Sequence, residues 1–180
     1  MNSQFLLEVD AFAEAAHRAV SQVRKYTGEA YIVHPREVAA MVAETGADEE
    51  VIAAALLHDV VEDTTVTNLE IETRFGERVA RLVAEVTDVS TPAGGNRASR
   101  KALDRAHLAA ASAEGQTIKL ADLISNSRSI LTHDRNFARV YLREKALLLA
   151  VLMRGDRRLH QMATSIVESA RAEFDRDFAV

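Results

Sequence analysis

The stretch ALLHDVVEDTT, residues 55–65, places four ionisable side chains at the end of an apolar segment that should lie in the protein interior. At about 100° per residue on an α-helix, His58, Asp59, Glu62 and Asp63 fall within one arc of about 140°. The Leu and Val side chains of the stretch occupy the opposite side. The sequence therefore predicts one continuous helix, capped by Asp48, whose last turns carry the ionisable groups on a single face.

The rest of the chain also follows a helical pattern. Apolar residues between positions 4 and 25 recur close to the helical repeat. Pro35 and Gly46 mark the start and end of a second helix, and Thr67 and Glu70 form a capping box. Further helices are predicted at about 77–88, 97–113, 117–131, 137–153 and 156–174. Since no alternating strand pattern appears, the predicted fold class is all-α, a single domain over residues 1–180 with about eight to nine helices.

The composition excludes several classes of protein. Hydrophobic residues make up 48% and charged residues 27%, which is ordinary for a soluble globular domain, and no cysteine is present for disulfides or thiolate chemistry. The net charge of −5 argues against a surface that coats nucleic acid. No apolar run approaches the roughly 20 residues that span a bilayer, and the N-terminal residues lack the basic segment of a secretory signal. We expect a cytoplasmic protein with neither nucleic acid nor membrane as a partner.

The acidic cluster itself favours a metal. Three acids near the C-terminal end of a helix repel one another and the helix dipole unless a cation compensates them. An imidazole beside an aspartate, with further carboxylates one turn on, suits a divalent metal. The alternative is an exposed acidic helix end with His58 as a bystander. His34 in YIVHP, and Asp122 one turn before Asn126 in IKLADLISN, add further candidate ligands, although each can also be an ordinary structural residue.

The order His…His-Asp…Asp is that of the HD-domain metal-dependent phosphohydrolases. Longer strings make the resemblance more specific: TGEAYIVHP (27–35), AALLHDVVEDT (54–64), FGERVARLVAEVTDVS (75–90) and IKLADLISNSRS (118–129). Over about residues 10–153 the chain resembles the hydrolase domain of the RelA/SpoT homologues, in particular their stand-alone form, the small alarmone hydrolases. The resemblance implies an HD-type helical bundle that binds manganese and removes the 3′-pyrophosphate from guanosine tetra- and pentaphosphate, a small-molecule nucleotide substrate.

The resemblance also implies a role for each matching residue. The metal ligands would be His34, His58, Asp59 and Asp122, and the catalytic acids that position and activate the attacking water would be Glu62 and Asp63. Substrate binding would fall to Arg24, Lys25, Tyr26, Arg100, Lys101 and Asn126. The expected cofactor is one divalent metal. Mn²⁺ is favoured, although a site of nitrogen and oxygen ligands also accepts zinc or iron.

Two departures from the family pattern concern the nucleoside. Tyr26 stands directly before the TGE loop, and the segment from Asp122 to Asn126 has lost the usual basic and imidazole side chains. These changes leave the identity of the purine base undetermined, so (p)ppApp is an alternative substrate to (p)ppGpp. Two rival functions also stand: an HD phosphohydrolase of another nucleotide, and a catalytically silent nucleotide sensor. The oligomeric state is open too, a homo-oligomer included.

Overall fold

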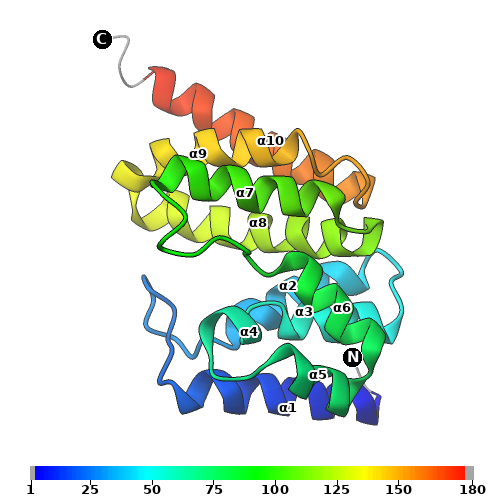
Figure 1. Ribbon diagram of the computed structural model, residues 1–180. Coiled ribbons are helices and arrows are strands. Elements are labelled where there is room, and N and C mark those ends of the chain that lie inside the picture. The colour runs from blue at the N-terminus through cyan, green and yellow to red at the C-terminus, as the bar shows by residue number, and fades with distance from the viewer. Residues whose placement is uncertain (1–2, 177–180) are drawn as a thin grey trace. The chain divides into compact units, whose positions relative to one another are not determined.

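The computed structural model describes residues 3–176 and contains ten α-helices within that range (Figure 1). The only β-type pairing among these residues is an isolated bridge between Val23 and Ala30. The predicted all-α fold class is confirmed. The helices fall into two compact units, one ending at Asp88 and the other beginning at Val89. No helix in the described range combines the length and apolar character that crossing a membrane requires.

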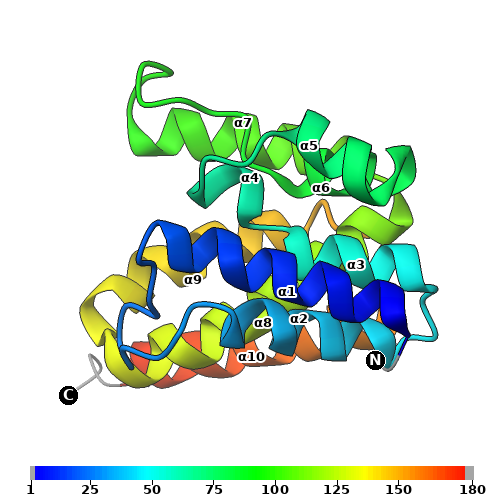
Figure 2. The ribbon, with the colours of Figure 1, turned by 90° about the horizontal axis from the view of Figure 1, so that it is seen from below.

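The described part of the first unit contains six helices: α1 (Gln4–Ala19), α2 (Val33–Ala43), α3 (Glu49–Leu57), α4 (Val60–Asp63), α5 (Asn68–Phe75) and α6 (Glu77–Val86). Its centre is α3, which packs against α1, α2 and α6, while α5 pairs with α6 (Figure 2). Every α3 residue from Val51 to Leu57 is buried. Asp48 caps α3 as predicted, since its side chain accepts the N–H groups of Glu50 and Val51.

The continuous helix predicted through His58 and Asp59 is wrong, because the chain breaks there into α3 and α4. The His58 ring explains the break. Its Nδ1 atom lies 2.8 Å from the carbonyl oxygen of Ala55, the group that the Asp59 N–H would bond in a continuing helix. Glu62 and Asp63 consequently lie in a new short helix rather than at the end of a long one.

The first helix ends well before the predicted end near residue 25. Ser21 adopts a φ of 55°, in the left-handed region. Its N–H bonds the carbonyl of Arg18, and the N–H of Gln22 bonds the carbonyl of His17. This is the Schellman arrangement that terminates helices, with serine where glycine is usual. Val23 is therefore 54% exposed in the loop that follows.

The described part of the second unit contains four helices: α7 (Arg97–Ala110), α8 (Ala113–His133), α9 (Arg135–Leu149) and α10 (Arg157–Arg176). Helix α8 packs against α7, α9 and α10. Its residues are buried almost without interruption from Gly115 to Ser127. The helix predicted at about 156–174 corresponds to α10.

The start of α8 is held by the connection between α9 and α10. The fully buried Gln116 side chain accepts the N–H of Arg154 at 2.8 Å and donates to the carbonyl of Leu108 at 3.2 Å. Gly155 lies directly against α8, because a Cβ there would come within 2.7 Å of Leu120 Cδ1 and 3.0 Å of the Gln116 backbone. These contacts fix the first turns of the helix that carries Asp122.

Helix α7 is tied to the segment before it by Asp104, which is buried. Its carboxylate accepts the N–H of Ser90 at 2.9 Å and the Ser90 hydroxyl at 3.0 Å, and Lys101 Nζ lies 3.3 Å away. Burial alone would raise the pKa of Asp104, but the Ser90 donors and Lys101 outweigh burial and lower the pKa. Asp104 is therefore ionised at neutral pH and holds Ser90 against α7.

Candidate metal and catalytic site

His58 closes α3 with its side chain turned back onto the helix. Because a carbonyl oxygen can only accept a hydrogen bond, the Nδ1 atom facing Ala55 carries a proton. The other ring nitrogen, Nε2, is then the one that can give up its proton and present a lone pair to a metal. The contact that ends α3 thus also sets the tautomer and orientation of the His58 ring.

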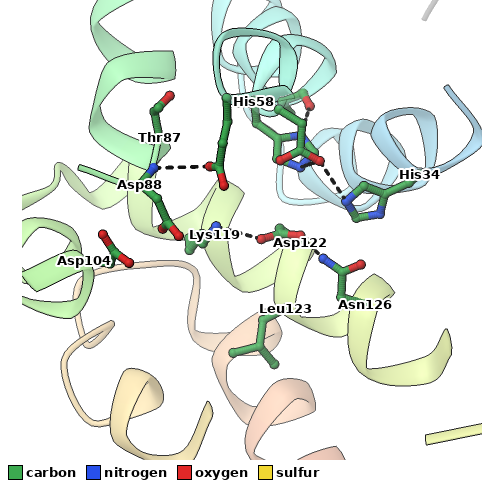
Figure 3. A network of polar contacts seen from close by, with 12 residues as sticks. His34, His58, Thr87, Asp88, Asp104, Lys119, Asp122, Leu123 and Asn126 are labelled. Atoms are coloured by element: carbon green, nitrogen blue, oxygen red, sulfur yellow. Dashed lines mark hydrogen bonds and ion pairs between the residues drawn. The ribbon is translucent and has the colours of Figure 1, made fainter. Parts of the chain in front are cut away.

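Three potential ligands converge at this point. His34 lies in the first turn of α2 and is fully buried. The Asp59 Oδ2 atom lies 3.1 Å from His58 Nε2 and 3.5 Å from His34 Nε2 (Figure 3). One ligand atom from each of the three residues lies within 4.8 Å of the others. Two ligands at about 2.1 Å from one metal, subtending about 90–110°, are about 3.0–3.4 Å apart. The His58–Asp59 separation lies within this range and the His34–Asp59 separation lies just above it, so this set of nitrogen and oxygen donors suits a divalent metal.

Asp59 is held in its ionised form. Burial alone would raise the pKa of Asp59, but in the metal-free protein the imidazoles of His58 and His34, which donate to this carboxylate when Nε2 is protonated, outweigh burial and hold that pKa well below its usual range. The Tyr31 hydroxyl donates to Asp59 Oδ2 at 2.6 Å, a length typical of a bond to a charged acceptor. A carboxylate fixed and ionised in this way is preorganised for a cation.

Glu62 and Asp63 lie one turn beyond Asp59, on α4, and both are exposed. Each accepts a hydrogen bond from elsewhere in the first unit. Glu62 Oε2 accepts the N–H of Asp88 at 3.3 Å, and Asp63 Oδ2 accepts from Gln22 Nε2 at 2.8 Å. Two accessible carboxylates one turn from a metal-binding group are able to take a proton or orient a water molecule.

Asp122, the fourth predicted ligand, lies on α8 in the second unit, together with Asn126 (Figure 3). Asp122 is 4% exposed. Its Oδ1 atom accepts from Asn126 Nδ2 at 2.6 Å, and its Oδ2 atom lies 2.9 Å from Lys119 Nζ. The two side chains share one face of α8, as their spacing predicts, and the buried carboxylate is paired. The role of Asp122 as a ligand stays a prediction.

Arg24, Lys25 and Tyr26 lie in the loop between α1 and α2. Lys25 Nζ sits 4.8 Å from the centre of the Tyr26 ring, and the backbone N–H of Arg24 closes the loop through a 2.9 Å hydrogen bond to the carbonyl of Glu29. A cavity of about 290 Å³ is lined by α1 and this loop, including His17, Gln22 and Tyr31. Cationic side chains and an aromatic ring on one loop suit phosphates and a base, and these roles also stay predictions.

Arg100 and Lys101 lie near the start of α7. Lys101 Nζ forms an ion pair with Asp104 Oδ2 at 3.3 Å, so Lys101 has a structural role. Arg100 is half-buried, and its Nε atom has no hydrogen-bond partner within the part of the chain that the structure describes. Arg100 thus has an unused donor within this part of the chain, and the phosphate-binding roles of both residues stay predictions.

The supporting contacts of Tyr31 and Gln22 were not predicted from the sequence. The bonds of Tyr31 and Gln22 reach carboxylates 28 and 41 residues further along the chain. Such contacts leave no local pattern. The one available signal was the place of Tyr31 within the string TGEAYIVHP.

A profile of the HD-domain family matches residues 11–147. This range takes in every metal-ligand, catalytic and substrate-binding residue predicted from the sequence. The chain therefore belongs to the HD-domain family.

Individual relatives and a solved structure indicate which members of the HD-domain family this chain is similar to. The chain is 41% identical over 128 residues to the guanosine-3′,5′-bis(diphosphate) 3′-pyrophosphohydrolase MESH1 of Danio rerio, covering 69% of this chain and 68% of that protein. It is 40% identical over 126 residues to the guanosine-3′,5′-bis(diphosphate) 3′-pyrophosphohydrolase of Aquifex aeolicus, covering 68% of this chain but only 18% of that longer protein. A solved structure of a metazoan orthologue of SpoT, which hydrolyses ppGpp and plays a role in starvation responses, matches with a TM-score of 0.83 and 29% identity, over 94% of this chain and 97% of that one. The resemblance to stand-alone alarmone hydrolases is confirmed.

Proposed function

We propose that this chain is a metal-dependent 3′-pyrophosphohydrolase of purine alarmones, (p)ppGpp and (p)ppApp. The observation that carries the proposal is the convergence of His34, His58 and Asp59, followed one turn later by two exposed acids. The 41% identity to a relative named for this reaction supports the choice of substrate class. With no cysteine in the sequence, a reducing compartment suits the protein, and we place the reaction in the cytoplasm.

One divalent metal, Mn²⁺, would be held by His34, His58 and Asp59, with Asp122 as the fourth ligand. When bound, such a cation lowers the pKa of a coordinated water and neutralises charge on phosphoryl oxygens. His58 supports this role because the Ala55 carbonyl leaves its Nε2 lone pair for the cation. Tyr31 supports it by fixing the Asp59 carboxylate.

Glu62 and Asp63 would take the proton of the attacking water or orient it. The water attacks the phosphorus next to the ribose 3′-oxygen. The bond from that phosphorus to the 3′-oxygen breaks, so that pyrophosphate leaves and a 5′-phosphorylated nucleoside remains. Arg24, Lys25 and Arg100 would hold phosphates, since guanidinium and ammonium groups donate several hydrogen bonds to phosphate oxygens. Tyr26 and Asn126 would contact the nucleoside, and Lys101 would act mainly through its Asp104 pair.

The decisive experiment incubates manganese-loaded protein with guanosine and adenosine 3′-pyrophosphates and separates the products by chromatography. We expect pyrophosphate and the 5′-phosphorylated nucleoside from both, with kcat/KM values within about 100-fold of each other, because a site that reads the base through few polar groups discriminates weakly. Turnover of a nucleoside monophosphate or cyclic nucleotide instead would favour another HD phosphohydrolase. Binding without turnover would favour a sensor. A preference of about 10⁴-fold between the bases would refute shared specificity and indicate a dedicated base contact.

A further inference from the structure

Asp63 is the end of a chain of three side chains that begins in the interior of the first unit. Gln22 Nε2 donates to Asp63 Oδ2 at 2.8 Å, and Gln22 Oε1 lies 2.7 Å from His17 Nδ1. His17 is 1% exposed, whereas Asp63 is exposed. An accessible carboxylate is thus linked through one glutamine to a buried imidazole.

The chemistry of the three groups fixes the direction of both hydrogen bonds. A carboxylate accepts, so the amide nitrogen of Gln22 must face Asp63 and its oxygen must face His17. An amide oxygen also accepts only, so His17 Nδ1 must carry a proton. Burial lowers the pKa of His17, which keeps the ring neutral near pH 7. The arrangement therefore requires the Nδ1–H tautomer of His17.

The backbone and the packing hold this chain in place. Gln22 follows the left-handed Ser21, and its N–H is bonded to the carbonyl of His17, so the end of α1 fixes where the Gln22 side chain starts. The His17 ring packs on the Tyr31 ring with centroids 4.7 Å apart. An exposed aspartate usually samples several rotamers, but the Asp63 carboxylate has a donor whose own position is set.

We propose that Gln22 and His17 are positioning residues that orient the Asp63 carboxylate for water activation. This inference rests on the proposed catalytic role of Asp63. Oδ2 is occupied by Gln22, and Oδ1 has no hydrogen-bond partner among residues 3–176. Oδ1 is then the oxygen that faces the water, and the Gln22 bond stops the carboxylate from rotating away. Neither positioning residue touches the reacting atoms.

A double-mutant cycle tests the coupling. Gln22→Leu removes the donor, and we expect kcat to fall about 10- to 100-fold, as for other supporting contacts of active-site groups, with KM and metal content unchanged. In an Asp63→Asn background the same change should alter kcat by less than about twofold, because the group through which Gln22 acts is gone. The matched control, Gln161→Leu at an exposed site on α10, should leave kcat unchanged. An equal loss in both backgrounds would overturn the proposal.

A pair of substitutions at position 17 tests whether the Nδ1 donor of His17 contributes. His17→Leu removes the Nδ1 donor and should lower kcat about as much as Gln22→Leu, whereas His17→Asn retains an amide N–H close to the Nδ1 position and should recover most of the loss. If His17→Leu does not fold, His17→Asn still tests the step. Activity near that of wild type supports the role of the donor, and activity as low as that of Gln22→Leu in a folded protein contradicts it.

A second measurement needs neither metal nor substrate. ¹⁵N NMR of the imidazole groups in metal-free protein, with His17 assigned by its loss in His17→Asn, should show a protonated Nδ1 and a bare Nε2. The opposite tautomer would refute the hydrogen-bond chain whatever the enzyme does. Conversely, the expected tautomer in a wild-type protein that cleaves neither alarmone would refute the proposed function and leave the chain of contacts as described, so the two failures are distinguishable.

Discussion

Replacing Tyr31 with Phe removes a single hydroxyl from the metal site. In the wild type this hydroxyl donates to Asp59 Oδ2 at 2.6 Å. Phe retains the ring, which packs on His17 at 4.7 Å and meets His34 edge-on at 5.8 Å between centroids. The substitution therefore isolates one hydrogen bond and leaves the packing around it intact.

The expected magnitude follows from the charge of the acceptor. A hydrogen bond to an ionised group contributes about 1.5–3 kcal/mol. Oδ2 is also the oxygen that both imidazole nitrogens face. The Tyr31 hydroxyl therefore holds the ligand atom itself in position, and without it the carboxylate must lose conformational freedom when the metal binds. Partners of metal ligands typically change metal affinity by about 10- to 100-fold, which is about 1.4–2.7 kcal/mol. We expect the Kd for Mn²⁺ to rise by this factor in Tyr31→Phe.

Calorimetric titration of metal-free protein with Mn²⁺ measures this Kd directly, without substrate. Tyr26→Phe is the matched control: it removes a hydroxyl from the same loop, and that hydroxyl accepts from Lys25 at 3.2 Å. The control should keep the wild-type Kd. A Kd within about twofold of wild type for Tyr31→Phe, or an equal rise in both variants, would contradict the reasoning.

Four further outcomes are expected. Glu62→Gln and Asp63→Asn should each slow turnover about 100-fold or more, with metal content, measured by elemental analysis, near that of wild type; joint loss of metal would contradict their assignment as water-activating groups. Gln116→Leu should lower the free energy of unfolding by about 1–3 kcal/mol, since it leaves the Arg154 N–H without its acceptor, whereas exposed Gln161→Leu should not. Gly155→Ala should cost about 1–3 kcal/mol through the clash with α8, which thermal unfolding detects. Asp104→Asn should remove stability that is complete above about pH 4 and is lost as the pH falls through the lowered pKa of Asp104, so its deficit in urea unfolding should shrink as the pH is lowered below about 4.

Local chemistry made much of the fold predictable. Asp48 caps α3 and Thr67 caps α5, as their residue types indicate, and Gly46 follows α2 with a φ of 82°. Two helix ends were missed because unusual residues make them. At the end of α1, Ser21 adopts the left-handed conformation that glycine usually adopts. At the end of α3, the His58 ring is hydrogen-bonded to a backbone carbonyl that would otherwise continue the helix.

The candidate site was likewise predictable only in part. The grouping of His34, His58 and Asp59 was expected from motif order and a family resemblance, because ligand residues at fixed spacing are visible in a sequence. The supporting contacts of Tyr31 and Gln22 were not expected. They depend on where loops pass once α1, α2 and α4 have packed, and tyrosine and glutamine carry no signature of such a contact.

The bond from the His58 ring to the Ala55 carbonyl makes this residue part of a helix end as well as a candidate metal ligand. A variant such as His58→Leu would therefore lose a helix-terminating donor and a ligand together, and its inactivity would have two causes. His58→Asn retains an N–H group close to the Nδ1 position but lacks the far side of the ring, including the Nε2 atom. A folded, permanently metal-free form of the protein, for use as a reference state in binding and spectroscopic work, is therefore best built as His58→Asn.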